Sequence, residues 1–234
     1  MKHVHSCGAA MITERKHFMK LPESIKAIIF DIDGTLIDSL DAWAEADREF
    51  LSEYDIPYDP VISERLKTMH YTSAIQFFLD EYDIPLSFDE AAHRITEIIR
   101  HKYFHEIEAK PCVMEFISLC HDKGIKMCAA TSNSRELAEG ALINRNIAPF
   151  LEFIITSDEI GSGKEKPEIF LYSAEKMGVS PENTAVFEDS VHAAKTSAAA
   201  GFYTVGVFDR HYADEFDHLK EICSHVIKGF DRLI

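Results

Sequence analysis

Short apolar runs that alternate with stretches of helical periodicity constrain the fold of this chain more than any other feature. Beyond Pro111 the alternation is regular along the chain. The predicted strands cover residues 126–131, 153–156, 184–187 and 203–208, and the predicted helices cover residues 112–122, 134–145, 167–177 and 191–200. Such strand–helix alternation predicts a parallel sheet with helices on both faces, which is the Rossmann-like α/β class.

An earlier strand is followed by a helical insertion. Residues 25–30 form a short apolar run that ends in Asp31-Ile32-Asp33-Gly34, the pattern of a buried strand that runs into a turn. Helical periodicity then continues over residues 40–106, with breaks around residues 57–60 and at Pro85.

The insertion divides the chain into three predicted parts. An N-terminal extension covers residues 1–24, the Rossmann-like core covers residues 25–40 and 110–234, and a small α-helical domain covers residues 41–109. Because the helical domain interrupts the core directly after its first strand, we interpret it as an insertion and not as a second tandem domain.

The composition excludes several classes of protein. An apolar fraction of 46% is that of a globular protein, and 40 acidic against 24 basic residues give a net charge of −16, which repels nucleic acid. No apolar run approaches the ~20 residues of a membrane span, and the N-terminus lacks the apolar segment of a secretory signal. The five cysteines are odd in number and include no Cys-x-x-Cys pair, which predicts reduced thiols. We therefore expect a cytoplasmic protein, a monomer or small homo-oligomer, without a nucleic-acid or membrane partner.

Polar side chains gather where the predicted strands end. In a parallel sheet of this class, ligands bind outside the carboxyl ends of the strands. The residues expected at that edge are Asp31, Asp33, Thr131, Ser132, Glu188 and Asp189, with Lys164 in the loop before Pro167. Four carboxylates would repel one another, and a hard divalent cation held by oxygen ligands relieves that repulsion. The pattern therefore predicts Mg²⁺ as the cofactor.

These motifs, in this order along the chain, resemble the four motifs of the haloacid dehalogenase-like hydrolase superfamily. The residues that carry the resemblance are Asp31-Ile32-Asp33-Gly34-Thr35-Leu36, Thr131, Lys164 and Glu188-Asp189. The helical insertion resembles the small α-helical cap of subfamily I, to which β-phosphoglucomutase and phosphoglycolate phosphatase belong. The resemblance covers nearly the whole chain from residue 25 onward and implies a phosphoric monoester hydrolase, that is, a phosphatase.

The resemblance implies a role for each carboxylate. Asp31 is expected to attack phosphorus and form an aspartyl-phosphate, and Asp33 is expected to protonate the leaving oxygen and then deprotonate the attacking water. The expected magnesium ligands are Asp31, the backbone carbonyl of Asp33, and Asp189. Glu188 either binds the ion directly or tunes it from beside the ligands. The alternative for Asp31 and Asp33, a solvated turn at a strand end, does not account for the three further motifs.

The same resemblance implies phosphate contacts from Gly34, Thr131, Ser132 and Lys164. Gly34 permits the turn that redirects Asp33, and the hydroxyl of Thr131 binds phosphate together with backbone N–H groups at the start of the following helix. Thr131 could instead cap that helix, a role that is compatible with binding phosphate. Lys164 is favoured over Lys166 because it stands three residues before Pro167, as in the family pattern.

Other activities compete with the phosphatase. Dehalogenase chemistry needs no acid at the position of Asp33, so Asp33 favours phosphate chemistry. A sugar phosphomutase of the β-phosphoglucomutase type is the stronger alternative. The cap arginine and the histidine of that enzyme fall at Tyr71 and Trp43 here, however, and Lys67 or His70 would have to substitute. A protein that binds a phosphate ligand without catalysis is the third alternative, although every catalytic position carries the residue that the chemistry requires.

The sequence therefore predicts a Mg²⁺-dependent phosphatase of a small phosphorylated metabolite, such as a sugar phosphate or a similar phosphomonoester. The helical insertion is expected to exclude water from the site and to contact the leaving group. The residues expected to set substrate specificity from the insertion are Trp43, Lys67, His70 and Tyr71.

Overall fold

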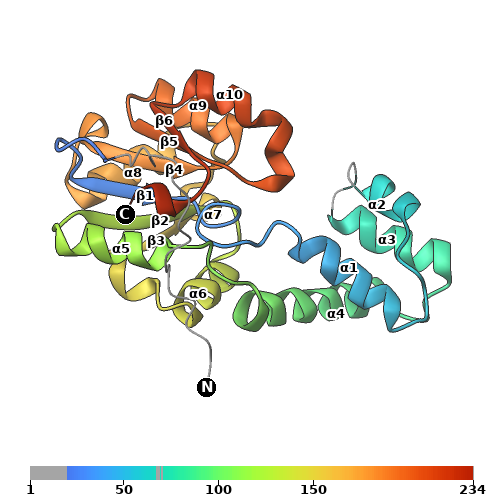
Figure 1. The fold of residues 1–234 in the computed structure, drawn as a ribbon. Coiled ribbons are helices and arrows are strands. Elements are labelled where there is room, and N and C mark those ends of the chain that lie inside the picture. The colour runs from blue at the N-terminus through green and yellow to red at the C-terminus, as the bar shows by residue number, and fades with distance from the viewer. Residues whose placement is uncertain (1–19, 67–68, 70, 234) are drawn as a thin grey trace, which may run out of the picture. The chain divides into compact units, whose positions relative to one another are not determined.

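The computed structural model describes residues 20–66, 69 and 71–233, and the chain divides into two compact units (Figure 1). The core unit comprises the chain up to Asp38 and from Glu108 onward, and the helical unit comprises Ser39–Ile107. The chain leaves and re-enters the core unit at adjacent places. The N–H of Asp38 donates to the carbonyl of Glu108 (3.0 Å), and the N–H of Lys110 donates to the carbonyl of Leu36 (2.9 Å).

The core unit contains one six-stranded parallel sheet in the order β3-β2-β1-β4-β5-β6. The strands are β1 (Ala27–Phe30), β2 (Lys126–Thr131), β3 (Ile154–Thr156), β4 (Thr184–Glu188), β5 (Tyr203–Val207) and β6 (His225–Ile227). The order reverses between β1 and β4, the place where sheets of this class bind ligands. The predicted Rossmann-like α/β fold is confirmed.

The helices of the core unit follow the strands in alternation. They are α5 (Val113–Asp122), α6 (Arg135–Asn144), α7 (Ser157–Ile160), α8 (Glu168–Met177), α9 (Val191–Ala199) and α10 (Phe216–Ile222). Helix α8 ends at Gly178, whose left-handed backbone (φ 69°) is the conformation that glycine favours after a helix. The sequence did not predict α7, α10 or β6, because these short elements lack the apolar runs that marked β1 and β3.

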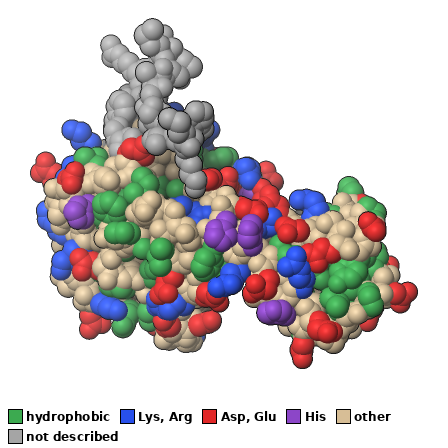
Figure 2. Space-filling model, turned by 90° about the horizontal axis from the view of Figure 1, so that it is seen from below, with side chains coloured by type: hydrophobic (Ala, Val, Ile, Leu, Met, Phe, Trp, Pro, Cys, Tyr) green, Lys and Arg blue, Asp and Glu red, His purple; other side chains and the backbone are tan. Residues whose placement is uncertain are grey.

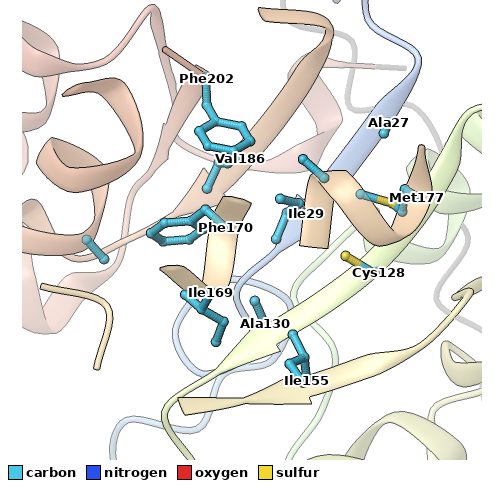
Figure 3. Packing of buried hydrophobic residues seen from close by; sticks show 12 residues of the cluster. Ala27, Ile29, Cys128, Ala130, Ile155, Ile169, Phe170, Met177, Val186 and Phe202 are labelled. Carbon is cyan, nitrogen blue, oxygen red and sulfur yellow. The ribbon is translucent and has the colours of Figure 1, made fainter. Parts of the chain in front are cut away.

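Both faces of the sheet are buried, so its central strands are apolar throughout. On one face Ile29 of β1 belongs to the same hydrophobic cluster as Phe170 of α8 (Figure 3). On the other face the ring centroid of Phe30 lies 5.2 Å from that of Phe187 in β4 and 6.3 Å from that of Phe116 in α5. Consecutive residues of β1 thus point to opposite faces, and both faces need apolar side chains.

The helical unit consists of α1 (Ala42–Ser52), α2 (Pro60–Leu66), α3 (Tyr71–Tyr82) and α4 (Phe88–His101), and α4 continues into the π turn η1 (Lys102–Glu106). A capping box starts α4. The hydroxyl of Ser87 accepts from the N–H of Glu90 (3.3 Å), and the carboxylate of Glu90 accepts from the N–H of Ser87 (2.8 Å). Phe50 of α1 and Phe78 of α3 are buried, with ring centroids 6.1 Å apart.

Three further predictions concern membrane spans, the charge of the surface and the state of the cysteines. Within the residues that the structure describes, no helix has the length and apolarity of a membrane span. Acidic and basic side chains are interspersed over the face drawn in Figure 2. Cys120, Cys128 and Cys223 are free thiols, as predicted, but Cys112 is disulfide-bonded, so the prediction was wrong for Cys112. Spacing along the chain does not show which thiols meet in space.

Candidate active site

The turn after β1 presents two aspartates at the carboxyl edge of the sheet. Asp31 follows the last residue of β1, and its N–H donates to the carbonyl of Phe187 in β4 (2.9 Å). Gly34 adopts a left-handed backbone (φ 79°), and its N–H donates to the carbonyl of Ile37 (3.0 Å). Because a side chain would strain this conformation, glycine is what allows so tight a turn to carry both Asp31 and Asp33.

The end of β4 supplies two further carboxylates. Because β1 and β4 are paired in register, Asp31 lies beside Glu188. The carboxylate of Glu188 accepts hydrogen bonds from the N–H (3.2 Å) and from the hydroxyl (3.0 Å) of Ser190. The carboxylate of Asp189 accepts one from the hydroxyl of Thr35 (3.3 Å). Two neighbouring strands therefore bring Asp31, Glu188 and Asp189 together.

A buried lysine joins the carboxylates of the two strands. The ammonium of Lys164, in the loop between α7 and α8, donates to Asp31 Oδ1 and, over 2.9 Å, to Glu188 Oε2. Burial by itself disfavours the charged form, but attraction to Asp31 and Glu188 outweighs it and raises the pKa of Lys164. Lys166 is exposed. The structure thus places Lys164, and not Lys166, against the carboxylates.

The acidic cluster holds more negative charge than Lys164 balances. Asp31, Glu188 and Asp189 are buried and offer ligand atoms within 4.8 Å of one another, the one such trio among the described residues. Burial, followed by repulsion from Glu188, raises the pKa of Asp31 to about 7. Burial, followed by repulsion from Asp31, raises the pKa of Asp189 to about 9. Both shifts express the cost of holding several anions where water has little access.

One oxygen of the cluster lacks a protein partner. Asp31 Oδ2 is buried and accepts no hydrogen bond from the described residues. Buried polar atoms are almost always satisfied by a partner, and a divalent cation would satisfy Oδ2 and offset the excess negative charge. Carboxylate oxygens are the donors that Mg²⁺ prefers in proteins. The residues present therefore fit the predicted cofactor.

The end of β2 places a hydroxyl near the second aspartate, and Asn133 connects the two. The N–H of Asn133 donates to Thr131 Oγ1 (3.0 Å), and its side-chain amide donates to Asp33 Oδ2 (3.2 Å). Ser134 caps α6, because its hydroxyl accepts from the N–H of Leu137 (3.4 Å), so Thr131 is not the cap. Asn133 was not among the predicted site residues, although its place directly after Thr131-Ser132 was an available signal.

The remaining predicted residues lie around the site or in the helical unit. The hydroxyl of Ser132 lies 3.3 Å from that of Ser157, the first residue of α7. Trp43 belongs to α1 and is 41% exposed. Tyr71 begins α3, but its side chain lies outside the described part of the chain, as do Lys67 and His70. A role in substrate specificity stays a prediction for these four residues of the helical unit.

Several proteins resemble the chain over most of its length. A phosphorylated carbohydrates phosphatase from Thermotoga maritima is 28% identical over 77% of this chain and 85% of its own length. A fructose-1-phosphate phosphatase from Escherichia coli is 27% identical over 79% of this chain and 97% of its own length. A solved Thermotoga maritima structure, described as a candidate β-phosphoglucomutase, has a TM-score of 0.79 and 25% identity over 89% of this chain and 97% of that one.

A family model also matches the chain. The model of the haloacid dehalogenase-like hydrolases matches residues 25–201, which is well over half of the chain and includes all the predicted motifs of the sheet edge. The relatives named as phosphatases resemble the chain in sequence, and the solved structure resembles it in fold. The chain therefore belongs to the haloacid dehalogenase-like hydrolase family, as its motifs predicted.

Proposed function

We propose that this hydrolase is a Mg²⁺-dependent phosphatase that cleaves small phosphorylated metabolites, sugar phosphates or similar phosphomonoesters, through an aspartyl-phosphate. The observation that carries the proposal is Asp31, a buried carboxylate with one oxygen bound by Lys164 and the other without a protein partner. A carboxylate that is buried beside a lysine and has room for a cation is suited to attack a phosphoryl group that both cations attract. The relatives named as phosphatases of carbohydrate phosphates and of fructose 1-phosphate support the substrate class.

Two aspartates divide the chemistry in this proposal. The Asp31 carboxylate attacks phosphorus, and the bond from phosphorus to the leaving oxygen breaks as Asp33 gives that oxygen a proton. Asp33 then takes a proton from a water molecule, which attacks the phosphorus of the aspartyl-phosphate. Inorganic phosphate leaves and the Asp31 carboxylate is restored. The hydrogen bond from Asn133 to Asp33 Oδ2 orients the carboxyl group for both proton transfers.

Lys164, Thr131 and Ser132 hold the phosphoryl group. Lys164 already contacts the nucleophile, so its charge lies next to the place where the phosphoryl group is transferred. The hydroxyl of Thr131 accepts a hydrogen bond from the N–H of Asn133, which leaves its proton free to be donated to a phosphate oxygen. Gly34 keeps the turn open enough for the phosphoryl group to approach the backbone.

The proposed ligands of Mg²⁺ are Asp31, Asp189 and the backbone carbonyl of Asp33. Glu188 has both oxygens engaged, one by Lys164 and one by Ser190, so it orients Lys164 and adds negative charge from beside the ligands. When bound, Mg²⁺ supplies the positive charge that lets an anionic phosphate approach an anionic nucleophile.

The helical unit is the cap of the enzyme in this proposal, with the core at residues 25–40 and 110–234 and the cap at residues 41–109. The cap excludes water and contacts the leaving group, with Trp43, Lys67, His70 and Tyr71 as its specificity residues. A sugar phosphomutase is the second candidate, and the TM-score of 0.79 to the candidate β-phosphoglucomutase favours it. A mutase must hold a second phosphate, and neither Trp43 nor Tyr71 brings a positive charge.

Hydrolysis of p-nitrophenyl phosphate tests the proposal. We expect activity with Mg²⁺, none with a chelator and none for Asp31→Asn. The matched control Asp122→Asn changes an exposed aspartate of α5 and should keep full activity. Activity that survives chelation or the Asp31→Asn substitution contradicts the proposal. If the wild-type protein releases no phosphate but interconverts sugar phosphates when primed with a sugar bisphosphate, the mutase is the correct candidate.

A further inference from the structure

The segment after β5 runs along the same edge of the sheet as the acidic cluster. Strand β5 pairs with β4 so that Gly206 lies opposite Glu188, and the residues after Val207 therefore emerge beside the end of β4. They form the short turn η4 (Arg210–Glu215), which carries Tyr212. No motif of the sequence pointed to this tyrosine.

Tyr212 is more exposed than the residues of the buried cluster. It is 37% exposed, whereas Asp31 and Lys164 are 7% and 5% exposed. Burial of the phenol, followed by the negative charge of Asp189 and, among weaker causes, that of Asp31, raises the pKa of Tyr212. This direction agrees with the strand register, which brings the segment that carries Tyr212 out beside the end of β4. A phenol is a neutral hydrogen-bond donor.

A buried polar network fixes the turn that carries Tyr212. The side chain of Asp209 is 2% exposed, and one of its oxygens accepts from the N–H of His211 (2.8 Å) and lies 2.8 Å from His211 Nδ1. The other oxygen accepts from the ammonium of Lys110 (2.8 Å), which also donates to the carbonyl of Phe208 (3.1 Å). The N–H of Tyr212 itself donates to the carbonyl of Asp209 (3.3 Å).

Such a network restricts the conformation of the turn more than it raises the free energy of unfolding. A buried ion pair contributes little net stability, because desolvation of its charges offsets their attraction. A buried polar network whose members are satisfied does, however, rigidify its surroundings. The backbone N–H of Lys110 also donates to the carbonyl of Leu36, in the segment that follows the Asp31 turn. The position of Tyr212 is thereby linked to the nucleophile's turn by a short chain of contacts.

We propose that Tyr212 contacts the organic part of the substrate and donates a hydrogen bond to one of its hydroxyl oxygens, with Asp209 and Lys110 as positioning residues. This inference rests on the proposed phosphatase function. The phosphoryl group belongs at the buried cation Lys164, so the rest of the substrate must extend from there toward solvent, where Tyr212 stands. A neutral donor suits a polyhydroxylated group there, since the neighbouring carboxylates repel a second anion.

The test compares substrates with and without hydroxyl groups. The wild-type protein and Tyr212→Phe are assayed with fructose 1-phosphate, glucose 6-phosphate and p-nitrophenyl phosphate. We expect Tyr212→Phe to lower kcat/KM about tenfold for the better sugar phosphate, mainly through KM, and to leave the aryl phosphate within about twofold. The matched control Tyr172→Phe changes an exposed tyrosine of α8 and should leave all three substrates unchanged.

A second variant tests whether Asp209 positions Tyr212. Asp209→Asn keeps the size of the side chain but weakens its hold on Lys110, and we expect the same substrate-dependent loss, about three- to fivefold, with thermal melting followed to confirm that the variant folds. An active wild-type protein with unchanged sugar-phosphate kinetics in Tyr212→Phe, or with an equal loss on aryl phosphate, overturns this inference alone. A wild-type protein that is inactive on all three substrates overturns the proposed function, and this inference with it.

Discussion

Among the described residues, each unit of the molecule buries one lysine beside carboxylates, and the two arrangements differ in what surrounds the anions. In the core unit the ammonium of Lys164 donates to Asp31 and Glu188. In the helical unit the ammonium of Lys102, on the π turn η1, lies 3.1 Å from Glu106, 3.2 Å from Glu49 and 3.8 Å from Glu45. Both lysines are less than a tenth exposed.

The carboxylates, and not the lysines, distinguish the two places. The three glutamates around Lys102 have side chains that are nearly half exposed, and the hydrogen bond from Lys102 lowers the pKa of Glu106. The carboxylates around Lys164 are buried, and the pKa of Asp31 is raised. The anions of the helical unit are open to water, whereas in the core unit the buried Asp31 Oδ2 accepts no hydrogen bond from the described residues. We infer that the carboxylates around Lys102 have a structural role and that the carboxylates around Lys164 have a chemical role.

Replacement of the core lysine has the largest expected effect. Lys164→Met removes the positive charge beside Asp31, the proposed nucleophile, and we expect kcat for p-nitrophenyl phosphate to fall about 10³-fold. Steady-state kinetics with saturating Mg²⁺ measure this loss, with the exposed Lys166→Met as the matched control two residues away. More than a tenth of the wild-type activity in Lys164→Met would contradict the assignment of this lysine.

The partly buried carboxylate of Asp47, which has no lysine beside it in the way that Asp31 has, should appear as a pH dependence of the free energy of unfolding. In the helical unit, burial raises the pKa of Asp47 in α1 to about 7, against about 4 in the unfolded chain. The folded state therefore holds the proton more tightly, and this group's stabilising contribution, fully present below pH ~4, is lost as the pH rises toward ~7. Asp47→Asn should remove this slope and raise the free energy of unfolding at pH 8 by about 2 kcal/mol.

Urea unfolding at pH 5 and at pH 8 measures that slope. The exposed aspartate at the end of α3 provides the control, since Asp83→Asn should leave the difference between the two pH values as in the wild-type protein. An Asp47→Asn protein with the full wild-type pH dependence would show that Asp47 is as well solvated in the folded chain as in the unfolded one.

Replacement of the helical lysine should affect stability and spare the chemistry. Lys102→Met leaves three glutamates that water can still reach, so we expect the free energy of unfolding to fall by only about 1.5 kcal/mol. The activity on p-nitrophenyl phosphate should stay within about threefold of wild type. The exposed Lys123→Met is the control for the loss of one positive charge. A loss of activity comparable to that of Lys164→Met would erase the distinction between the two clusters.

The smallest expected effect is on stability and comes from one helix cap in each unit. Ser87→Ala removes one half of a reciprocal capping box at the start of α4 and should cost about 1 kcal/mol. Ser134→Ala removes the longer, single hydrogen bond at the start of α6 (3.4 Å) and should cost about half as much. Thermal unfolding of both variants ranks the two caps, and the reverse order would contradict the reading of their geometry.

The sequence pattern was sufficient to predict the structure wherever residues close together in sequence determine it. The apolar run before Asp31 predicts β1, and the left-handed position of Gly34 follows from the turn that must separate the two aspartates. The family also followed from sequence, because its motifs are short and ordered. Short elements such as β6 and α10 were not predicted, because their formation depends on the edge of a sheet that is already assembled.

The sequence by itself determined the alternation of strands and helices, the residues at the strand ends and the family to which the chain belongs. The tertiary structure alone decided that one lysine ammonium joins Asp31 to Glu188, that Asn133 donates to Asp33, and that the segment with Tyr212 leaves the sheet beside the end of β4. The physical reason is that periodicity and turns are set by residues a few positions apart. Contacts between residues 100 or more positions apart are set by strand order and register, which only the packed sheet fixes.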